Sequence, residues 1–295
     1  MRLYREFTSQ EEIDQQYNMA ARVPDMPARL AEFSEKSAQV RQELNCTLDV
    51  RFGPTLEETV DIFPAAQPGA PVLVFIHGGY WRWGGSKDFS FVARGPVQCG
   101  VTVVVTHYSL CPDVTIAEIT RQSRAVIAWL HRRAPTFDAN PNQIFVAGHS
   151  AGGQQVGMLA ATDWQGRYGL PNGVIKGAIA ISGIYDLHPL RYSWLQPKLL
   201  LDHEIILHQS PLFNLPDAGP PLLITYGDRE SDEFHRQAAE YFKAWRSRGL
   251  SVEIYEQAGA DHFGAIEGFA DADSHFCRKL IDFIQKNGGP CENPR

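Results

Sequence analysis

Residues 144–153 read IFVAGHSAGG, a short apolar run that ends in Gly148-His149-Ser150-Ala151-Gly152. This G-x-S-x-G arrangement lies between an expected strand and a segment that can continue as a helix, which is the context the motif requires. Gly148 and Gly152 permit a turn so sharp that larger side chains on either side of Ser150 would collide. The stretch predicts a serine nucleophile at the end of a sheet, and the alternative is a glycine-rich loop that contains a serine by chance.

Apolar runs of strand length recur along the chain, and helical stretches separate most of them. The expected strands are Pro71–His77, Val101–Thr106, Gln143–Gly148, Gly177–Ser182, Leu222–Gly227 and Ser251–Gln257. The expected helices are Thr115–Arg132, Ala151–Thr162, Asp232–Arg248 and Ala272–Lys286. Unbroken apolar runs suit strands that are buried on both faces. Their alternation with helices predicts an α/β fold with a mainly parallel, doubly wound sheet.

The N-terminal 45 residues are polar and helix-prone. Ser9 and Glu12 form a capping box that opens a helix through about Ala21, and Pro24 and Pro27 are expected to break it. Residues 28–44 read as a second helix. Apolar positions are sparse, so we expect these helices to lie over another surface. A lid over the active site and a dimer arm are the two alternatives, and the second leaves a homodimer open.

The remaining segments fit one domain spanning residues 1–295. Cys46–Phe52 and Glu58–Phe63 alternate apolar and polar residues and predict an edge hairpin. Residues 183–215 form a long irregular insert after the sixth strand, and loops of this length in a compact domain are usually functional.

Composition excludes several classes of protein. A net charge of −7 without a Lys/Arg run argues against a nucleic-acid partner. The apolar runs are too short to span a bilayer, so no membrane association is expected. The first twelve residues lack the apolar core of a signal peptide, which favours a cytoplasmic location. No metal or organic cofactor is implied, and a small-molecule substrate is the expected partner.

The partners of Ser150 should follow later strands, because ligands of open α/β sheets bind beyond the carboxyl ends of the strands. His262 is the only histidine after Ser150 that lies in a loop just past an expected strand, which predicts it as the general base. Asp228 and Glu230 both follow the strand before it, and either could orient the imidazole. Asp261 adjoins His262 along the chain, so we expect it to be a loop or capping residue.

The loop His77-Gly78-Gly79-Tyr80-Trp81 follows the first buried strand, where lipases and esterases carry an oxyanion loop. Backbone N–H groups of Gly78, Gly79 and Ala151 are the expected oxyanion donors. His77 is expected to brace the loop by hydrogen bonding. The expected substrate-binding residues are Tyr80, Trp81 and His149, with a weaker expectation for Trp83.

With these residues assembled, the chain resembles the kynurenine formamidase (arylformamidase) group of alpha/beta hydrolases. The similarity runs from about Tyr17 to the last helix. Four motifs carry it: the HGGYW loop followed by Ser86-Lys87-Asp88, Gly183-Ile184-Tyr185-Asp186-Leu187 with Pro189-Leu190, Glu233-Phe234-His235-Arg236-Gln237, and Asp261-His262-Phe263.

The resemblance implies a catalytic triad of Ser150, Glu230 and His262. It places the orienting acid at Glu230 rather than Asp228, although family members commonly have aspartate there. It also implies hydrolysis of N-formyl-L-kynurenine to kynurenine and formate in tryptophan breakdown. Residues 193–196, SWLQ, depart from a more polar family stretch, so the substrate could differ if they line the pocket.

Two alternative functions are compatible with this fold. A carboxylesterase of short-chain or aryl esters would need the same catalytic groups, because leaving-group preference resides in the pocket. A non-catalytic binding protein on this fold would need a broken triad, and this one is complete in sequence.

Overall fold

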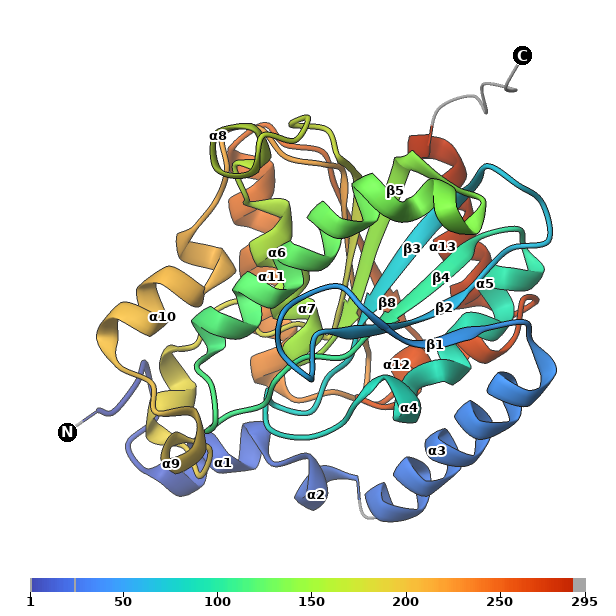
Figure 1. The fold of residues 1–295 in the computed structure, drawn as a ribbon. Helices are drawn as coiled ribbons and strands as arrows, with labels where there is room; N and C mark the ends of the chain where they lie inside the picture. Colours follow the sequence, from blue (N-terminus) through green and yellow to red (C-terminus); the bar gives the residue numbers. More distant parts are fainter. Residues whose placement is uncertain (1, 24, 289–295) are drawn as a thin grey trace.

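The computed structural model describes residues 2–23 and 25–288 and is built around a single sheet (Figure 1). Eight strands follow in the order β1-β2-β4-β3-β5-β6-β7-β8. Their bounds are β1 Thr47–Arg51, β2 Thr59–Phe63, β3 Ala70–Ile76, β4 Thr102–Thr106, β5 Ala139–His149, β6 Ile175–Ile181, β7 Leu222–Gly227 and β8 Val252–Gln257. The pairs β1–β2 and β2–β4 are antiparallel and the other pairs are parallel. The prediction of an edge hairpin on a mainly parallel α/β sheet is confirmed.

The register of the central strands aligns the ends that carry the motifs. Ile76 of β3 pairs with Gly148 of β5, and His149 pairs with Ile181 of β6. Because these strands are parallel, the loops that follow them leave the sheet at the same edge. The HGGYW loop and the serine turn are therefore neighbours in space.

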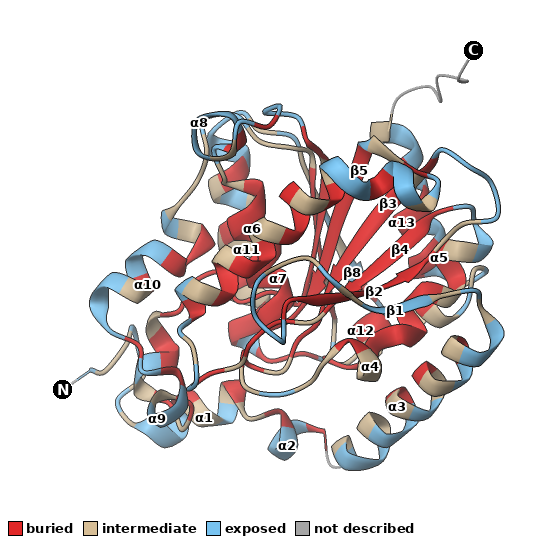
Figure 2. Ribbon diagram, in the orientation of Figure 1, coloured by how far each residue is buried: buried red, intermediate tan, exposed pale blue. Residues whose placement is uncertain are grey.

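Helices cover both faces of the sheet, as predicted. Figure 1 shows α6 (Ile116–Arg133), α7 (Ala151–Ala160) and α11 (Asp232–Ser247) on one side, with α5 (Arg94–Gln98) and α13 (His275–Gly288) on the other. The strands between the two edges of the sheet are red along most of their length in Figure 2, while the outer faces of the helices are largely exposed. Among residues 2–23 and 25–288, no helix combines the length and apolar character needed to cross a membrane.

The N-terminal segment forms α1 (Gln10–Tyr17), α2 (Met19–Arg22) and α3 (Met26–Glu43). The capping box of Ser9 and Glu12 is present. The predicted helix through about Ala21 is wrong, because Asn18 is extended and ends α1. Pro27 begins rather than breaks a helix, since the first turn of α3 needs no N–H from it. Pro24 lies outside the described residues.

Short helices fill the connections. The insert after β6 contains η3 (His188–Tyr192), α9 (Gln196–Leu199), α10 (His203–Gln209) and η4 (Pro211–Phe213). These pieces are too short for a periodic pattern to predict. The other short helices are α4 (Ser86–Phe89), η1 (Ser90–Ala93), η2 (Ala134–Phe137), α8 (Trp164–Tyr168), α12 (Gly264–Glu267) and η5 (Gly268–Ala270).

Candidate active site

Ser150 occupies a strained turn between β5 and α7. Its backbone has φ 56° and ψ −115°, a conformation that a non-glycine residue adopts only when its surroundings enforce it. A Cβ on Gly148 would collide with the carbonyl group of Gly152, and one on Gly152 would collide with the carbonyl oxygen of Ile76. Both glycines are therefore required by close backbone approach. The turn projects Ser150 from the sheet edge at the N-terminus of α7.

Glu230 is the carboxylate that contacts His262. One of its oxygens accepts a hydrogen bond from His262 Nδ1 at 2.8 Å. The other accepts from the Gly227 N–H at 2.9 Å and from the Ser182 hydroxyl. The Glu230 side chain has no exposed surface. Three donors thus hold this carboxylate in place and compensate its buried charge.

Asp228 faces elsewhere. Its carboxylate accepts a hydrogen bond from the Gly259 N–H at 2.8 Å, which closes the turn after β8. Asp261 behaves as expected of a loop residue, because it accepts from the N–H groups of Phe263 and Gly264 at 3.1 and 2.8 Å. The sequence pattern offered Asp228 and Glu230 as candidates for the orienting acid. Of these two, Glu230 is the one positioned to orient the imidazole of His262.

A cavity of about 280 Å³ lies at this edge of the sheet, and Ser150 and His262 both line it. Among the described residues the hydrogen-bond chain runs from Glu230 to His262 and does not extend to the Ser150 hydroxyl. Bonds of this kind are often long in enzymes without substrate and tighten in the complex. With Nδ1 engaged by Glu230, Nε2 is the nitrogen of His262 left to accept a proton.

Gly78 places the oxyanion loop against the nucleophile. A Cβ on Gly78 would lie 3.1 Å from Ser150 Cβ and 3.0 Å from the carbonyl oxygen of His149. Gly79 has φ 113° and also lines the cavity. Ala151 is the first residue of α7, where backbone N–H groups have no partner within the helix. The three expected donors therefore lie on elements that meet around Ser150.

His77 braces the loop, as its position in the sequence suggested. Its Nδ1 is 2.7 Å from the Gly78 carbonyl oxygen and its ring stacks on Tyr108 at 4.1 Å. Because a carbonyl oxygen can only accept, Nδ1 carries the proton. Burial lowers the pKa of His77 to about 3. A histidine that stays neutral and fully buried supports the loop without acting as a second base.

His149 also holds a neighbour in place. Its Nε2 is 2.8 Å from the backbone oxygen of His262, so it ties the serine turn to the loop that carries the imidazole. Burial, followed by the nearby His262 ring, lowers the pKa of His149 well below its usual value. The neutral ring lines the cavity, as expected of a substrate-binding position.

Not all of the aromatic residues in and after the oxyanion loop line the cavity as predicted. Tyr80 lines the cavity and donates its hydroxyl to the Tyr17 carbonyl oxygen at 2.5 Å. Trp81 is fully buried, bonds to Gln154 through its indole N–H at 2.9 Å, and does not line the cavity. The prediction of Trp81 as a substrate-binding residue is wrong, because its ring turns into the core. Trp83 does line the cavity and is partly exposed.

The N-terminal segment forms one wall of the cavity, which the sequence suggested only as one of two alternatives. Asn18, Met19 and Ala20 line it, as do Met26 and Leu30. Trp194, from the insert that departs from the family pattern, lines it too. The pattern of apolar and polar residues in the sequence does not show that these side chains line a cavity. The two methionines offered the one usable signal, since flexible thioethers are common at adaptable binding surfaces.

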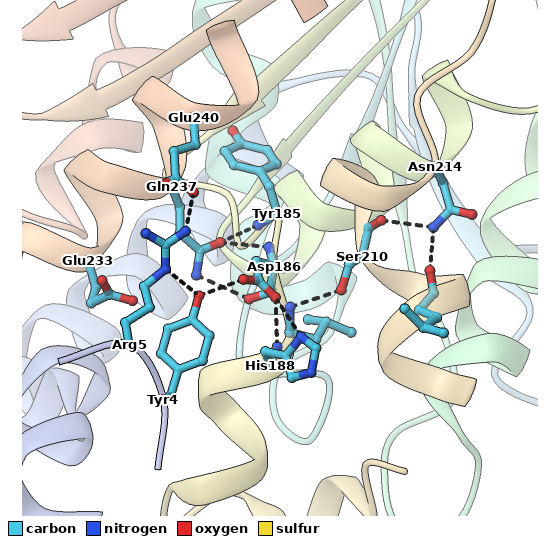
Figure 3. A network of polar contacts seen from close by, with 12 residues as sticks. Tyr4, Arg5, Tyr185, Asp186, His188, Ser210, Asn214, Glu233, Gln237 and Glu240 are labelled. Carbon is cyan, nitrogen blue, oxygen red and sulfur yellow. Dashed lines mark hydrogen bonds and ion pairs between the residues drawn. The ribbon is translucent and has the colours of Figure 1, made fainter. Parts of the chain in front are cut away.

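Two of the motifs that carry the family resemblance, residues 183–187 and residues 233–237, contact the N-terminal segment rather than Ser150. The Tyr17 hydroxyl donates to Glu233 at 2.8 Å and accepts from Gln237 at 2.8 Å. Figure 3 shows Gln237 reaching the backbone of Tyr185 and Asp186, and Tyr4 pointing at the Asp186 carboxylate. The residues of both motifs therefore fasten Tyr4 and Tyr17, and with them the N-terminal segment between these residues, to the body of the molecule.

A second clamp joins α3 to the loop that carries His262. Arg29 contacts Asp261 and Glu267, each at 2.5 Å, and its side chain is mostly buried. Since Asp261 precedes His262, this pair fixes the pocket wall to the loop of the expected base. Partly buried ion pairs are screened less by solvent and salt than exposed ones.

Replacing Tyr17 by phenylalanine should loosen this wall. The change removes one hydroxyl and leaves Glu233 and Gln237 each short of a buried partner, at a cost of about 1–3 kcal/mol in unfolding free energy. Urea denaturation measures the loss, and hydrogen exchange should show it concentrated in residues 10–43. Tyr192→Phe is the matched control, because the Tyr192 hydroxyl makes no hydrogen bond to another described residue. Equal destabilisation by both changes would contradict the anchoring role.

Comparisons with known proteins agree with this geometry. Residues 73–265 match the family model described as alpha/beta hydrolase fold. The chain is 29% identical to the kynurenine formamidase of Danio rerio over 95% of this chain and 98% of that protein. It is 34% identical to the carboxylesterase NlhH of Mycobacterium tuberculosis over 68% of each. A solved structure from Silicibacter sp. TM1040, provisionally assigned as a thioesterase, has a TM-score of 0.78 and 27% identity, covering 93% of this chain and 99% of that chain.

The family match covers most of β3, all of β4 to β8, the serine turn and the loop of His262, and the relatives named after their activity are hydrolases of amides or esters. The chain belongs to the alpha/beta hydrolase fold family and is an enzyme of the hydrolase type.

Proposed function

We propose that the enzyme hydrolyses an aryl formamide, with N-formyl-L-kynurenine as the lead substrate, through an acyl-enzyme on Ser150. The observation that carries the proposal is the shared cavity, in which Ser150, His262 and Gly78 meet beneath aromatic side chains. Similarity to the zebrafish kynurenine formamidase over nearly the whole of both chains supports the formamide as substrate. The product kynurenine would place the reaction in tryptophan breakdown.

In the first half-reaction, His262 Nε2 takes the proton of the Ser150 hydroxyl as the oxygen attacks the formyl carbon. Glu230 accepts the hydrogen bond from Nδ1 and stabilises the imidazolium that forms. Backbone N–H groups of Gly78, Gly79 and Ala151 stabilise the oxyanion. The imidazolium then protonates the departing aryl amine, so the C–N bond breaks and formyl-Ser150 remains.

In the second half-reaction, water replaces the amine. His262 takes a proton from the water as its oxygen attacks the formyl carbon, and the same N–H groups hold the new oxyanion. The imidazolium returns this proton to Ser150 Oγ as the bond between Oγ and the formyl carbon breaks, and formic acid leaves and releases its remaining proton to solvent as formate. Enzyme protonation is unchanged over the cycle.

The N-terminal segment serves as the lid of this site in our proposal. Asn18, Met19 and Met26 line the cavity together with Ser150, and the buried bonds of Tyr17 keep them there. A wall of this kind limits water around the reacting carbonyl and positions the aryl group. A dimer arm does not need residues inside the cavity.

The test compares kcat/KM for N-formylkynurenine with kcat/KM for phenyl acetate and p-nitrophenyl acetate. We expect the formamide to reach at least 10⁴ M⁻¹ s⁻¹, the lower end of the usual range for a natural substrate. Activated esters are chemically easier to cleave, so some ester turnover is also expected. A preference for the esters by several orders of magnitude would refute the formamidase proposal and favour the carboxylesterase suggested by the mycobacterial relative.

A further inference from the structure

We infer that Arg82 binds a carboxylate on the leaving group, so that the pocket selects substrates that carry this carboxylate over analogues that lack it. The inference deepens the proposed function and rests on it, because it concerns the substrate of the same site. Arg82 follows the oxyanion loop directly and lines the cavity together with Ser150 and Trp194. It is half-buried, so a ligand in the cavity can reach it.

The guanidinium of Arg82 lies over the ring of Trp194. Arg82 Cζ lies 4.8 Å from the centroid of the Trp194 ring. Tyr80 packs against the same ring in a T-shaped arrangement at 6.1 Å. A cation over an aromatic face is held there by the ring quadrupole, and an arginine in this position still offers N–H groups that match the two oxygens of a carboxylate. The contact with Trp194 therefore positions Arg82 without occupying its N–H donors.

The charge of Arg82 has no counterpart on the protein. No aspartate or glutamate is among the described residues that line the cavity, and Arg82 is their only lysine or arginine. None of the ion pairs among the described residues includes Arg82, whereas Arg29, Arg121 and Arg236 each contact two carboxylates. A chain with net charge −7 has many carboxylates available, yet none compensates this guanidinium. The missing partner is a carboxylate of the ligand.

This chemistry fits an aryl formamide whose aryl group carries an amino-acid group with a free carboxylate. The carboxylate takes no part in bond breaking, so Arg82 contributes uniform binding to the ground state and transition state. Its loss should therefore appear mainly in KM. Trp194, which contacts Arg82, belongs to the SWLQ stretch that departs from the family pattern.

The test uses two pairs of substrates that differ in a carboxylate. One pair is N-formylkynurenine and its decarboxylated formamide, and the other is 4-acetoxyphenylacetate and its methyl ester. The readout is the ratio of kcat/KM for the member with the carboxylate to that for the member without it. We expect wild-type enzyme to prefer the carboxylate in both pairs, and Arg82→Gln to lower the ratio about 10- to 100-fold through KM. Arg82→Lys should restore part of it, because a point charge lacks the planar fork.

Arg132→Gln is the matched control. Arg132 is exposed on α6, so the change removes the same charge far from the cavity. An equal fall in the ratio for Arg82→Gln and Arg132→Gln would overturn the inference, as would a wild-type enzyme that shows no preference for the carboxylate in either pair. Failure of the proposed function looks different: neither formamide is cleaved, while the ester pair still reports on Arg82.

Discussion

Replacing Ser150 by alanine should lower kcat by about 10⁶-fold for formamides and esters alike. The strained turn places this one hydroxyl at the cavity, beside Gly78 and at the N-terminus of α7. Without it, His262 has no nucleophile to activate, and only the oxyanion donors and binding remain. The measurement is single-turnover and steady-state kinetics on N-formylkynurenine and p-nitrophenyl acetate.

A phosphonate reagent supplies the complementary measurement. Intact-mass analysis should show one phosphonyl group on wild-type enzyme and none on Ser150→Ala. Ser247→Ala is the control, since Ser247 is exposed at the end of α11 and bonds only to its own helix. A Ser150→Ala variant that keeps more than a hundredth of wild-type turnover would refute the nucleophile assignment, and so would labelling of another serine.

Replacing Glu230 by glutamine should lower kcat by about 10⁴-fold, while KM changes little. Glutamine keeps the size of the side chain but offers an amide in place of the charge that His262 Nδ1 contacts at 2.8 Å. The imidazolium then loses its stabilising partner, and the ring can settle in the wrong tautomer. Steady-state kinetics on both substrate classes measures the loss.

Asp228→Asn is the matched control for Glu230→Gln. Asp228 follows the same strand but contacts the backbone N–H of Gly259, so its replacement should alter kcat by less than about threefold. Thermal unfolding of both variants separates lost catalysis from lost folding. Collapse of turnover in the Asp228 variant alone would show that the orienting acid is misassigned.

The sheet and the positions of the expected catalytic groups could be predicted because they depend on local rules. Buried parallel strands contain unbroken apolar runs, as β3 and the second half of β5 show, and their carboxyl ends meet at one edge. Gly148 and Gly152 are required because a Cβ at either position would collide with the backbone, so the motif alone predicts the turn at Ser150. His262 followed from its place after the last strand.

The lining of the cavity could not be predicted in the same way. Whether a side chain faces the core or the cavity depends on the backbone around it, and Trp81 has φ 57°, which turns its ring towards Gln154. Trp83, two residues on, faces the cavity instead. The choice between Asp228 and Glu230 was also tertiary, because it depends on contacts of Glu230 with His262 and with Ser182, which follows β6.

The clamps on the N-terminal segment affect the order in which the molecule is completed during synthesis. Tyr17 and Arg29 leave the ribosome early, yet their partners Glu233, Asp261 and Glu267 are made more than 200 residues later. Contacts so distant in sequence form late, since the intervening chain must first be ordered. A nascent chain therefore carries the serine turn before it can close the pocket around it. The pocket wall and the expected catalytic base His262 are therefore completed at the same late stage of synthesis.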